Sequence, residues 1–141
     1  MGQRTVKERI ALSISRRKGS VFFPADFKRI GSSSQVGRAL RALILEGRLV
    51  RVGHGIYVKA RPSVISGKPV PRICLAEITQ EALIKWGIPV RLGRAQAAYA
   101  EGRTDQVPYK TAFDTGKHRI TRKITVGIST VEFENNVNTR D

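Results

Sequence analysis

The pattern of apolar and polar residues in the first half of the chain passes from a helical to a strand periodicity. Over residues 35–46, apolar side chains recur every three or four positions, which predicts a helix. Ser34, or one of the two serines before it, can cap this helix, and Gly47 follows its end as a C-terminal glycine would. Residues 49–52 and 56–59 are apolar or β-branched, which predicts a hairpin around a turn with two glycines.

The two faces of the predicted helix differ in chemistry. At about 100° per residue, four apolar side chains fall within an arc of roughly 100°, and they are Val36, Leu40, Leu43 and Ile44. Gln35, Arg38 and Arg41 lie on the other side. Gln and Arg side chains can read adenine and guanine edges in the major groove of DNA, whereas the alternative is that they form a solvated surface. The basic hairpin that follows favours contact with nucleic acid.

The residues before this helix predict two further helices. Thr5 can cap a first helix that ends near Lys18, and Glu8 has the spacing of a capping box. Pro24 fits the first position of a short helix over residues 25–30. The short helix, the serine turn and the next helix have the order of a helix-turn-helix, and the hairpin would be its wing.

The second half of the chain predicts a smaller mixed module. Residues 61–71 hold three prolines and a glycine, which indicates a linker or an extended crossing segment. Helices are predicted next at residues 73–86 and 91–100. Alternation of apolar and polar residues then predicts a small antiparallel sheet, with strands at residues 109–114, 119–126 and 130–134. The polar tail, residues 135–141, is expected to fray.

Positive charge is concentrated in the first half of the chain. The whole chain has a formal charge of +15, and residues 1–71 hold 15 Lys and Arg against 3 acids. Residues 72–141 hold 11 against 8. The basic half favours a polyanionic partner, because it can neutralise phosphates and release their counterions. An anionic membrane surface would require a basic helix with a bulky apolar face, and the sequence presents none.

Few residues indicate catalysis or a bound metal. His54 and His118 have no metal-ligating neighbour at a useful spacing. The single cysteine, Cys74, leaves no internal disulfide and is expected to be a small buried apolar residue rather than a nucleophile. Residues 31–39 superficially look like a phosphate-binding loop, but they lack its spacing, its lysine and its final Ser or Thr. We therefore expect no enzyme, no cofactor and no metal site.

The sequence also gives an expectation for the compartment. No apolar run reaches the length of a transmembrane helix, and the first residues lack the apolar core of a signal peptide. The single cysteine fits a reducing compartment. These features together predict a cytoplasmic protein.

Several segments resemble the AbiEi-type antitoxins of bacterial type IV toxin–antitoxin systems, in particular their short, stand-alone members. The similarity rests on a first helix, the motif VFFPADF, a serine-rich turn and the motif RALRALILEGRLVRVGHGIYV. It continues through the helix motif GRAQAA and the tripeptide QVP to a last hairpin, and it covers roughly residues 5–134. The most specific part runs from Gly47 to Tyr57, and many winged helices share a weaker form of it.

The resemblance implies a winged helix-turn-helix that binds inverted repeats in a promoter and represses its own operon. Longer members carry a further C-terminal domain that is implicated in neutralising a nucleotidyltransferase-like toxin. We expect no room for that domain in a chain that ends at Asp141.

The predicted fold class is α+β. A winged helix-turn-helix DNA-binding domain is expected in residues 1–62, and a small helical and antiparallel-sheet module for dimerisation, partner binding or accessory DNA contact in residues 72–134. The predicted function is sequence-specific binding of double-stranded DNA at an inverted repeat, as a homodimeric repressor of the antitoxin type. Two alternatives stay open: a protein-interaction role, as an antitoxin or a phage or plasmid accessory factor with a toxin or another protein partner, and binding of structured RNA.

The candidate DNA-binding residues form three groups. The residues assigned to the major groove are Ser33, Ser34, Gln35, Arg38 and Arg41, with Gln35 and Arg38 assigned to base edges. The residues assigned to the wing are Arg51, His54 and Lys59. The residues assigned to phosphates are Arg16, Arg17, Lys28 and Arg29. His54 has an alternative role as a turn residue, and Arg16 and Arg17 can instead complement the C-terminal end of a helix dipole.

Overall fold

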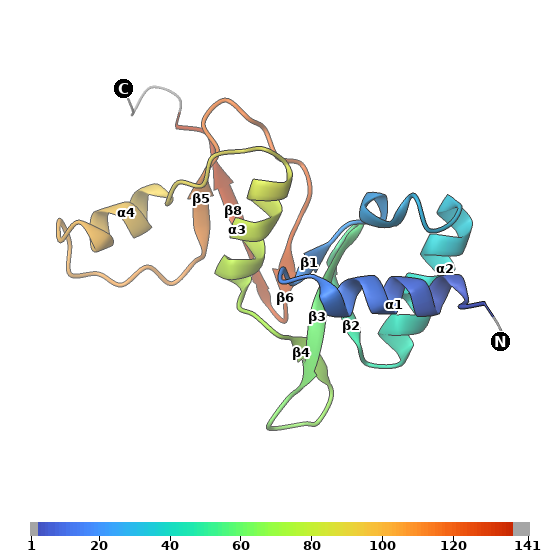
Figure 1. Ribbon diagram of the computed structural model, residues 1–141. Coiled ribbons are helices and arrows are strands. Elements are labelled where there is room, and N and C mark those ends of the chain that lie inside the picture. Colours follow the sequence, from blue (N-terminus) through green and yellow to red (C-terminus); the bar gives the residue numbers. More distant parts are fainter. Residues whose placement is uncertain (1–2, 137–141) are drawn as a thin grey trace. The chain divides into compact units, whose positions relative to one another are not determined.

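The computed structural model describes residues 3–136 and has mixed α+β architecture (Figure 1). Two compact units divide the chain, Met1–Ile73 and Cys74–Asp141, and we call them the N-terminal and the C-terminal unit. Within the described residues, no helix is both long and apolar enough to cross a membrane.

Helix α1 of the N-terminal unit spans Val6–Arg16 and begins as predicted. The Thr5 hydroxyl accepts a hydrogen bond from the Glu8 backbone N–H at 3.1 Å, and the Glu8 carboxylate accepts one from the Thr5 N–H at 3.1 Å. These two bonds satisfy donors that have no partner within the helix. The predicted capping box is therefore confirmed.

The next two helical elements differ slightly from the prediction. The short helix η1 is a 3₁₀ helix over Pro24–Phe27 rather than an α-helix over residues 25–30. Helix α2 spans Ser33–Leu45, and its N-cap is Ser32, whose hydroxyl accepts from the Gln35 N–H at 3.2 Å. Gly47 follows α2 with a φ of +76°, a conformation that glycine adopts at little cost.

The sheet of the N-terminal unit is antiparallel. Strand β1 (Val21–Phe22), which the sequence did not predict, pairs with β3 (Ile56–Pro62), and β3 pairs with β2 (Leu49–Gly53). Strand β4 (Pro69–Pro71) pairs with the second part of β3. The predicted hairpin is confirmed.

Residues 61–71 form neither the linker nor the extended crossing segment that the sequence predicted. The segment begins with the last residues of β3, turns, and returns as β4, and Pro62 lies opposite Pro69 in this second hairpin. Proline is tolerated here because β4 is a short edge strand and proline lacks only the N–H that a central strand would donate.

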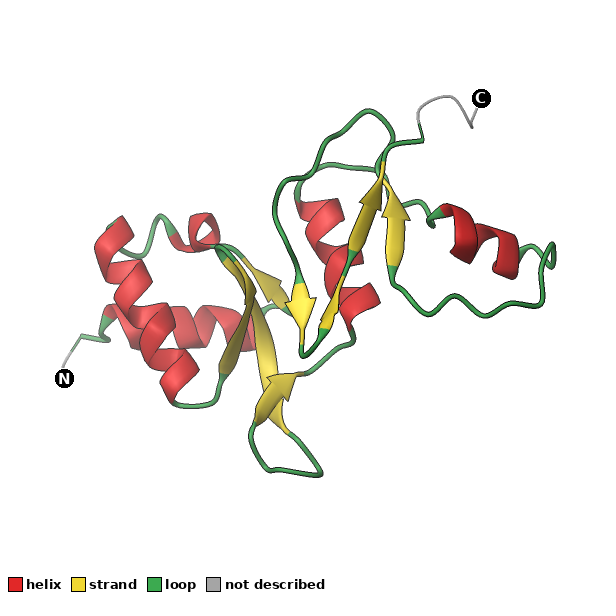
Figure 2. Ribbon diagram, turned by 180° about the vertical axis from the view of Figure 1, so that it is seen from behind, coloured by secondary structure: helices red, strands yellow, loops and turns green. Residues whose placement is uncertain are grey.

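The core of the N-terminal unit lies where α1, α2 and the sheet meet (Figure 2). Its fully buried side chains include Ile10, Phe22, Phe27 and Leu40, all at most 1% exposed. The rings of Phe22 and Phe27 lie 6.0 Å apart between centroids. Because α2 buries only one stripe of its surface against this core, its opposite stripe is free to contact something else.

Between residues 74 and 136, which the structure describes, the C-terminal unit contains two helices and four short strands. These are α3 (Leu75–Lys85), α4 (Arg94–Ala100), β5 (Ala112–Asp114), β6 (Thr125–Val126), β7 (Ser129–Thr130) and β8 (Glu132–Glu134). The predicted antiparallel sheet is only partly present. β6 and β7 are antiparallel, but β5 and β8 are parallel. A parallel pair needs a long connection, and residues 115–131 supply it.

Two local predictions for the C-terminal unit are wrong. Cys74 is exposed rather than buried, because it is the N-cap of α3 and the core stripe begins one residue later, at Leu75. Asn135 does not fray, since its side-chain amide donates to the carbonyl oxygens of Gly116 and His118, both at 2.9 Å. The rest of the predicted tail, residues 137–141, lies outside the described residues.

Candidate nucleic-acid interface

Helix α2 presents a basic stripe on the side opposite its buried face. At about 100° per residue, four exposed residues fall within an arc of roughly 60°, and we call them the α2 stripe: Ser34, Arg38, Arg41 and Leu45. Among the described residues, neither arginine has a hydrogen-bond or ion-pair partner in the protein. Their charges are therefore available to an external ligand.

Leu45 belongs to this stripe, although the sequence reasoning did not assign it. The side chain is 88% exposed at the C-terminal end of α2. The sequence did contain a signal for this position, because Leu45 follows Arg41 by four residues and such a spacing places two side chains on one side of a helix. An exposed leucine beside two arginines suits a surface that is covered when a partner binds.

Gln35 and Ser33 lie at the first turn of α2, away from the centre of the stripe. The Gln35 side-chain oxygen accepts from the Ser32 N–H at 2.8 Å, so this group completes the cap of the helix. Ser33 is exposed at the first helical position. The structure thus gives Gln35 a structural contact, and leaves Ser34 and Arg38 as the outward-facing residues closest to the N-terminal end.

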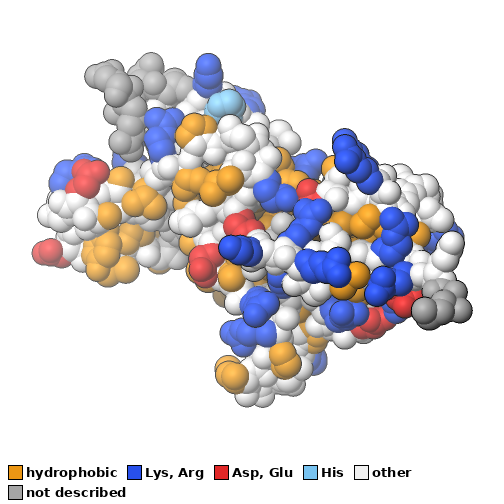
Figure 3. All heavy atoms as spheres, viewed as in Figure 1, with side chains coloured by type: hydrophobic (Ala, Val, Ile, Leu, Met, Phe, Trp, Pro, Cys, Tyr) orange, Lys and Arg blue, Asp and Glu red, His pale blue; other side chains and the backbone are white. Residues whose placement is uncertain are grey.

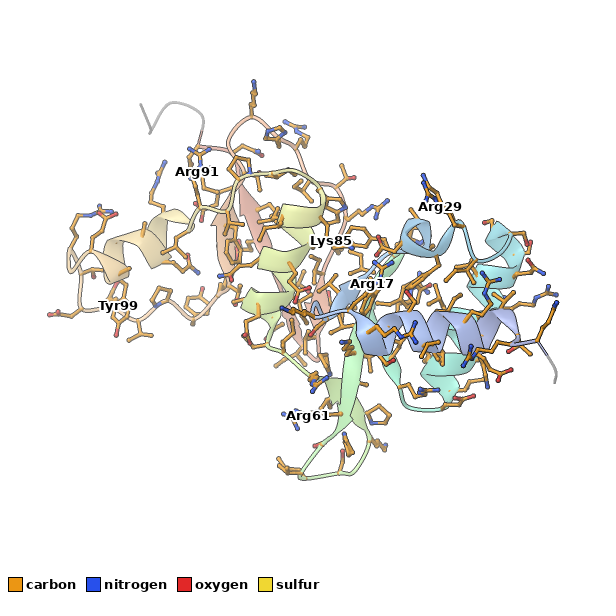
Figure 4. The ribbon with its side chains drawn as sticks, viewed as in Figure 1. Arg17, Arg29, Arg61, Lys85, Arg91 and Tyr99 are labelled. Carbon is orange, nitrogen blue, oxygen red and sulfur yellow. The ribbon has the colours of Figure 1, made fainter. Side chains whose placement is uncertain are left out.

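At the C-terminal end of α1, two of the predicted DNA-contact residues make bonds within the unit. The Arg17 guanidinium donates to the Asp26 carbonyl oxygen at 3.3 Å and lies 5.6 Å from the Phe27 ring centroid (Figure 4). The Lys59 ammonium donates to the Arg17 carbonyl oxygen at 2.7 Å. Arg16 is exposed in the last turn of α1. Arg17 and Lys59 therefore stabilise the unit, whereas Arg16 points to solvent.

Lys59 was predicted to belong to the wing, and its position in β3 separates it from the turn. It pairs with Leu49, at the end of β2 that lies farthest from the turn. Its ammonium also lies 5.9 Å from the ring centroid of Phe22. Lys59 therefore contacts the end of α1 rather than the turn of the hairpin.

The turn between β2 and β3 is tight and internally bonded. Gly53 pairs with Ile56, so the turn consists of His54 and Gly55, whose φ is +69°. The Arg51 side chain donates to the Gly53 carbonyl oxygen at 3.2 Å and lies 3.3 Å from Nδ1 of His54. The structure thus brings Arg51 and His54 together at one exposed point.

Lys28 and Arg29 follow η1 directly and are both exposed. The Arg29 side chain projects away from the body of the unit (Figure 4). Among the described residues, neither side chain makes a hydrogen bond or an ion pair. They can serve as contacts for phosphates, as the sequence predicted.

The charged residues of the N-terminal unit are mostly basic. Residues 1–73 hold 16 Lys and Arg and 3 acids, a formal charge of +13. Lys and Arg side chains cover much of the face of this unit that Figure 3 shows. Such a surface raises the local concentration of polyanions and the rate at which they associate.

The three acids of the unit are all used locally. Glu8 caps α1, and the bonds from Thr5 hold its pKa below the ordinary value. Asp26 accepts from the Phe23 N–H at 2.9 Å. Glu46 pairs with Lys7, whose hydrogen bond lowers the pKa of Glu46. Each acid of this unit therefore has a partner within the unit.

The described residues contain no group of three or more His, Cys, Asp and Glu side chains placed to hold a metal ion.

Residues 7–139 match a family of unknown function, DUF6088. The chain belongs to the DUF6088 family. No curated protein matches the chain. Neither comparison gives a function for this DUF6088 chain. The features that suggest one come from its structure, and they are the α2 stripe, the β2–β3 turn and the charge around them.

Proposed function

We propose that the N-terminal unit is a winged helix-turn-helix that binds double-stranded DNA, with α2 in the major groove. The order of elements supports this proposal: α1, β1, η1, α2 and then the β2–β3 hairpin, with β3 between β1 and β2 in the sheet. In this fold the second helix of the helix-turn-helix reads the groove, and the hairpin lies beside it.

The α2 stripe carries the proposal. An amphipathic helix requires polar residues on its outer side, but not two arginines whose side chains have no partner in the part of the chain that the structure describes. The 13 residues of α2 make a helix about 20 Å long, and the major groove, about 12 Å wide, admits such a helix. Arg38 lies in the first half of α2, where base contacts concentrate, and a guanidinium pairs bidentately with guanine.

The other predicted residues divide by their contacts. Arg16, Lys28 and Arg29 are exposed and would bind phosphates, which position a protein on DNA without reading sequence. Arg51 and His54 would contact the duplex beside α2. Arg17, Lys59 and Gln35 act mainly by holding the fold in place.

The C-terminal unit is proposed to join two copies on an inverted repeat. Residues 74–141 hold 10 Lys and Arg against 8 acids, so this unit is close to neutral. It exposes large apolar side chains, among them Tyr109 at 91% and Ile128 at 103%, which flank a cleft of about 420 Å³. A near-neutral surface with exposed apolar residues suits a protein partner better than a phosphate backbone.

Repression of the protein's own operon is the biological role proposed from this binding, in line with the resemblance to AbiEi-type antitoxins. The test is footprinting on the upstream region of the protein's own gene, with random duplex of equal length as competitor, at two salt concentrations. Protection of an inverted repeat that survives excess competitor is the expected result.

Three outcomes would contradict the proposal. Binding that follows duplex length and salt alone would indicate a general coating of nucleic acid, because counterion release carries no sequence information. Competition by duplex RNA as effective as by duplex DNA would favour the alternative of structured RNA. A co-purified protein that abolishes DNA binding would instead point to the antitoxin role.

A further inference from the structure

A second β-hairpin extends the N-terminal unit beyond its central sheet. Residues 60–62 of β3 continue past the end of β2 and pair with β4, and residues 63–68 join the two strands. We call residues 60–71 the arm. Figures 1 and 2 both show the arm projecting from the rest of the unit.

The turn of the arm is ordered by its own hydrogen bonds. The Ser63 N–H donates to the Lys68 carbonyl oxygen at 2.8 Å, and the Gly67 N–H donates to the Ser63 carbonyl oxygen at 2.9 Å. The Ser63 hydroxyl accepts from the N–H groups of Ile65 at 3.2 Å and Ser66 at 3.4 Å. Four bonds centred on one serine make this a preorganised turn, in which little conformational freedom is lost on binding.

The tip of this ordered turn is apolar. Val64 and Ile65 are each 94% exposed, so neither contributes to the core of the unit. A single exposed aliphatic residue is ordinary, but two adjacent ones at the end of a projecting turn form a wedge. Such a wedge gains stability only when another molecule removes it from water.

The charge around the tip indicates the kind of molecule. Residues 47–76 carry six Lys and Arg and no acid. Arg61 and Lys68 lie on the two sides of the turn and are exposed, and Figure 4 shows Arg61 on the arm. A partner that accepts both the apolar tip and these flanking cations is polyanionic.

The end of β4 that adjoins the turn of the arm lies beside the C-terminal end of α2, because Pro69 pairs with Pro62 next to that turn. A Cβ atom on Gly47, just after α2, would lie 3.3 Å from Cγ of Pro69. Only the turn, residues 63–68, extends beyond this point. Three residues on each side of it add at most about 10 Å of reach, and half the length of α2 is about the same. Their sum, roughly 20 Å, is close to half a turn of B-DNA, about 17 Å, which separates a major groove from the next minor groove.

From this geometry we infer that the arm inserts Ile65 and Val64 into the minor groove beside the α2 site and kinks the duplex. The inference rests on the proposed DNA binding by α2. Apolar wedges that enter the minor groove partly unstack a base step, while neighbouring Lys and Arg hold the backbone. An anionic membrane is the weaker candidate, because the tip has no Trp, Phe or Leu and the arm is not an amphipathic helix.

The test compares full-length protein with the double variant Val64→Ser, Ile65→Ser on one probe. The probe is a 30-base-pair duplex selected by the unmodified protein from a random library and labelled at its two ends for energy transfer. The matched control is Val107→Ser, which removes an exposed aliphatic residue from a loop of the C-terminal unit, away from the cleft that Tyr109 and Ile128 flank. Lys68→Gln tests the flanking charge separately.

The expected result is a bend of at least about 20° with the unmodified protein and with Val107→Ser, and its loss with the double variant. The double variant should bind about 10-fold more weakly, with an unchanged melting temperature, because the two side chains are outside the core. Lys68→Gln should keep the bend and lower the slope of log K against log salt by about one.

Two results would overturn the inference. The first is selective binding by all variants with equal affinity and no bend, which would leave α2 binding intact and exclude the wedge. The second is loss of binding to vesicles of phosphatidylcholine with phosphatidylserine in the double variant only, which would assign the arm to a membrane surface. Failure of the unmodified protein to select any duplex would refute the proposed function itself, and the wedge with it.

Discussion

Replacement of Arg38 by alanine separates the proposed base contact from any contribution to stability. Arg38 is exposed on the α2 stripe, and among the described residues it has no hydrogen-bond or ion-pair partner. Alanine is also the best helix former. The free energy of unfolding should therefore change by less than about 0.5 kcal/mol, as at other surface positions without contacts.

The effect on DNA binding should be much larger than the effect on stability. A bidentate pair between arginine and guanine contributes about 1–3 kcal/mol. At about 1.4 kcal/mol per factor of ten, this loss corresponds to an affinity about 5- to 140-fold weaker on the selected duplex. On a random duplex Arg38 can contact only phosphate, so the loss there should be smaller and should shrink as salt is raised.

The assay is fluorescence anisotropy on the selected and on a scrambled duplex, at two salt concentrations. Arg119→Ala is the matched control, because Arg119 is an exposed arginine of the C-terminal unit. Equal losses on both duplexes would make Arg38 a phosphate contact. Unchanged affinity on both would refute the placement of α2 in the major groove.

Three further predictions concern the fold around this interface. Lys59→Met should lower the free energy of unfolding by about 1 kcal/mol in urea titrations, because it removes the ammonium that donates to the Arg17 carbonyl oxygen; unchanged stability would contradict this role. Gly55→Ala should destabilise by about 1–2 kcal/mol, because alanine is strained at a φ of +69°, and Gly55→Asn should cost less in the same titration. The bonds from Thr5 lower the pKa of Glu8, so its contribution to stability is complete above its ordinary pKa of 4.5 and is lost as pH falls below it. Glu8→Gln should keep an acceptor for the Thr5 N–H and lose less melting temperature between pH 6 and pH 3 than the unmodified protein; equal losses would contradict the assignment.

Local signals in the sequence were sufficient for much of the N-terminal unit. The Thr5 capping box, Gly47 after α2 and the tight turn at Gly55 depend on residues within four positions of one another. The free side chains of the α2 stripe follow from helical periodicity alone, because only one face of α2 can pack against the core.

Other features depend on contacts that periodicity does not encode. Residues 61–71 were predicted to be a linker or an extended crossing segment because their prolines suggest a break, yet Pro62 and Pro69 pair on an edge where proline is tolerated. The parallel pairing of β5 with β8 joins residues far apart in sequence. The hydrogen bond from Lys59 to the Arg17 carbonyl oxygen could not be predicted from periodicity either, since 42 positions separate the two residues.

The cations of the N-terminal unit fall into two groups, according to whether their side chains have partners within the fold. One group holds the fold through the Glu46 carboxylate or through backbone carbonyl oxygens, and it consists of Lys7, Arg9, Arg17 and Lys59. The other group is exposed without partners among the described residues, and it includes Arg16, Lys28, Arg29, Arg38 and Arg41. Removal of a cation from the first group should lower stability, whereas removal from the second should lower only the affinity for a polyanion and its dependence on salt. The formal charge of +13 therefore overstates the charge available to a ligand, and the second group is the one whose positions define the proposed DNA-binding surface.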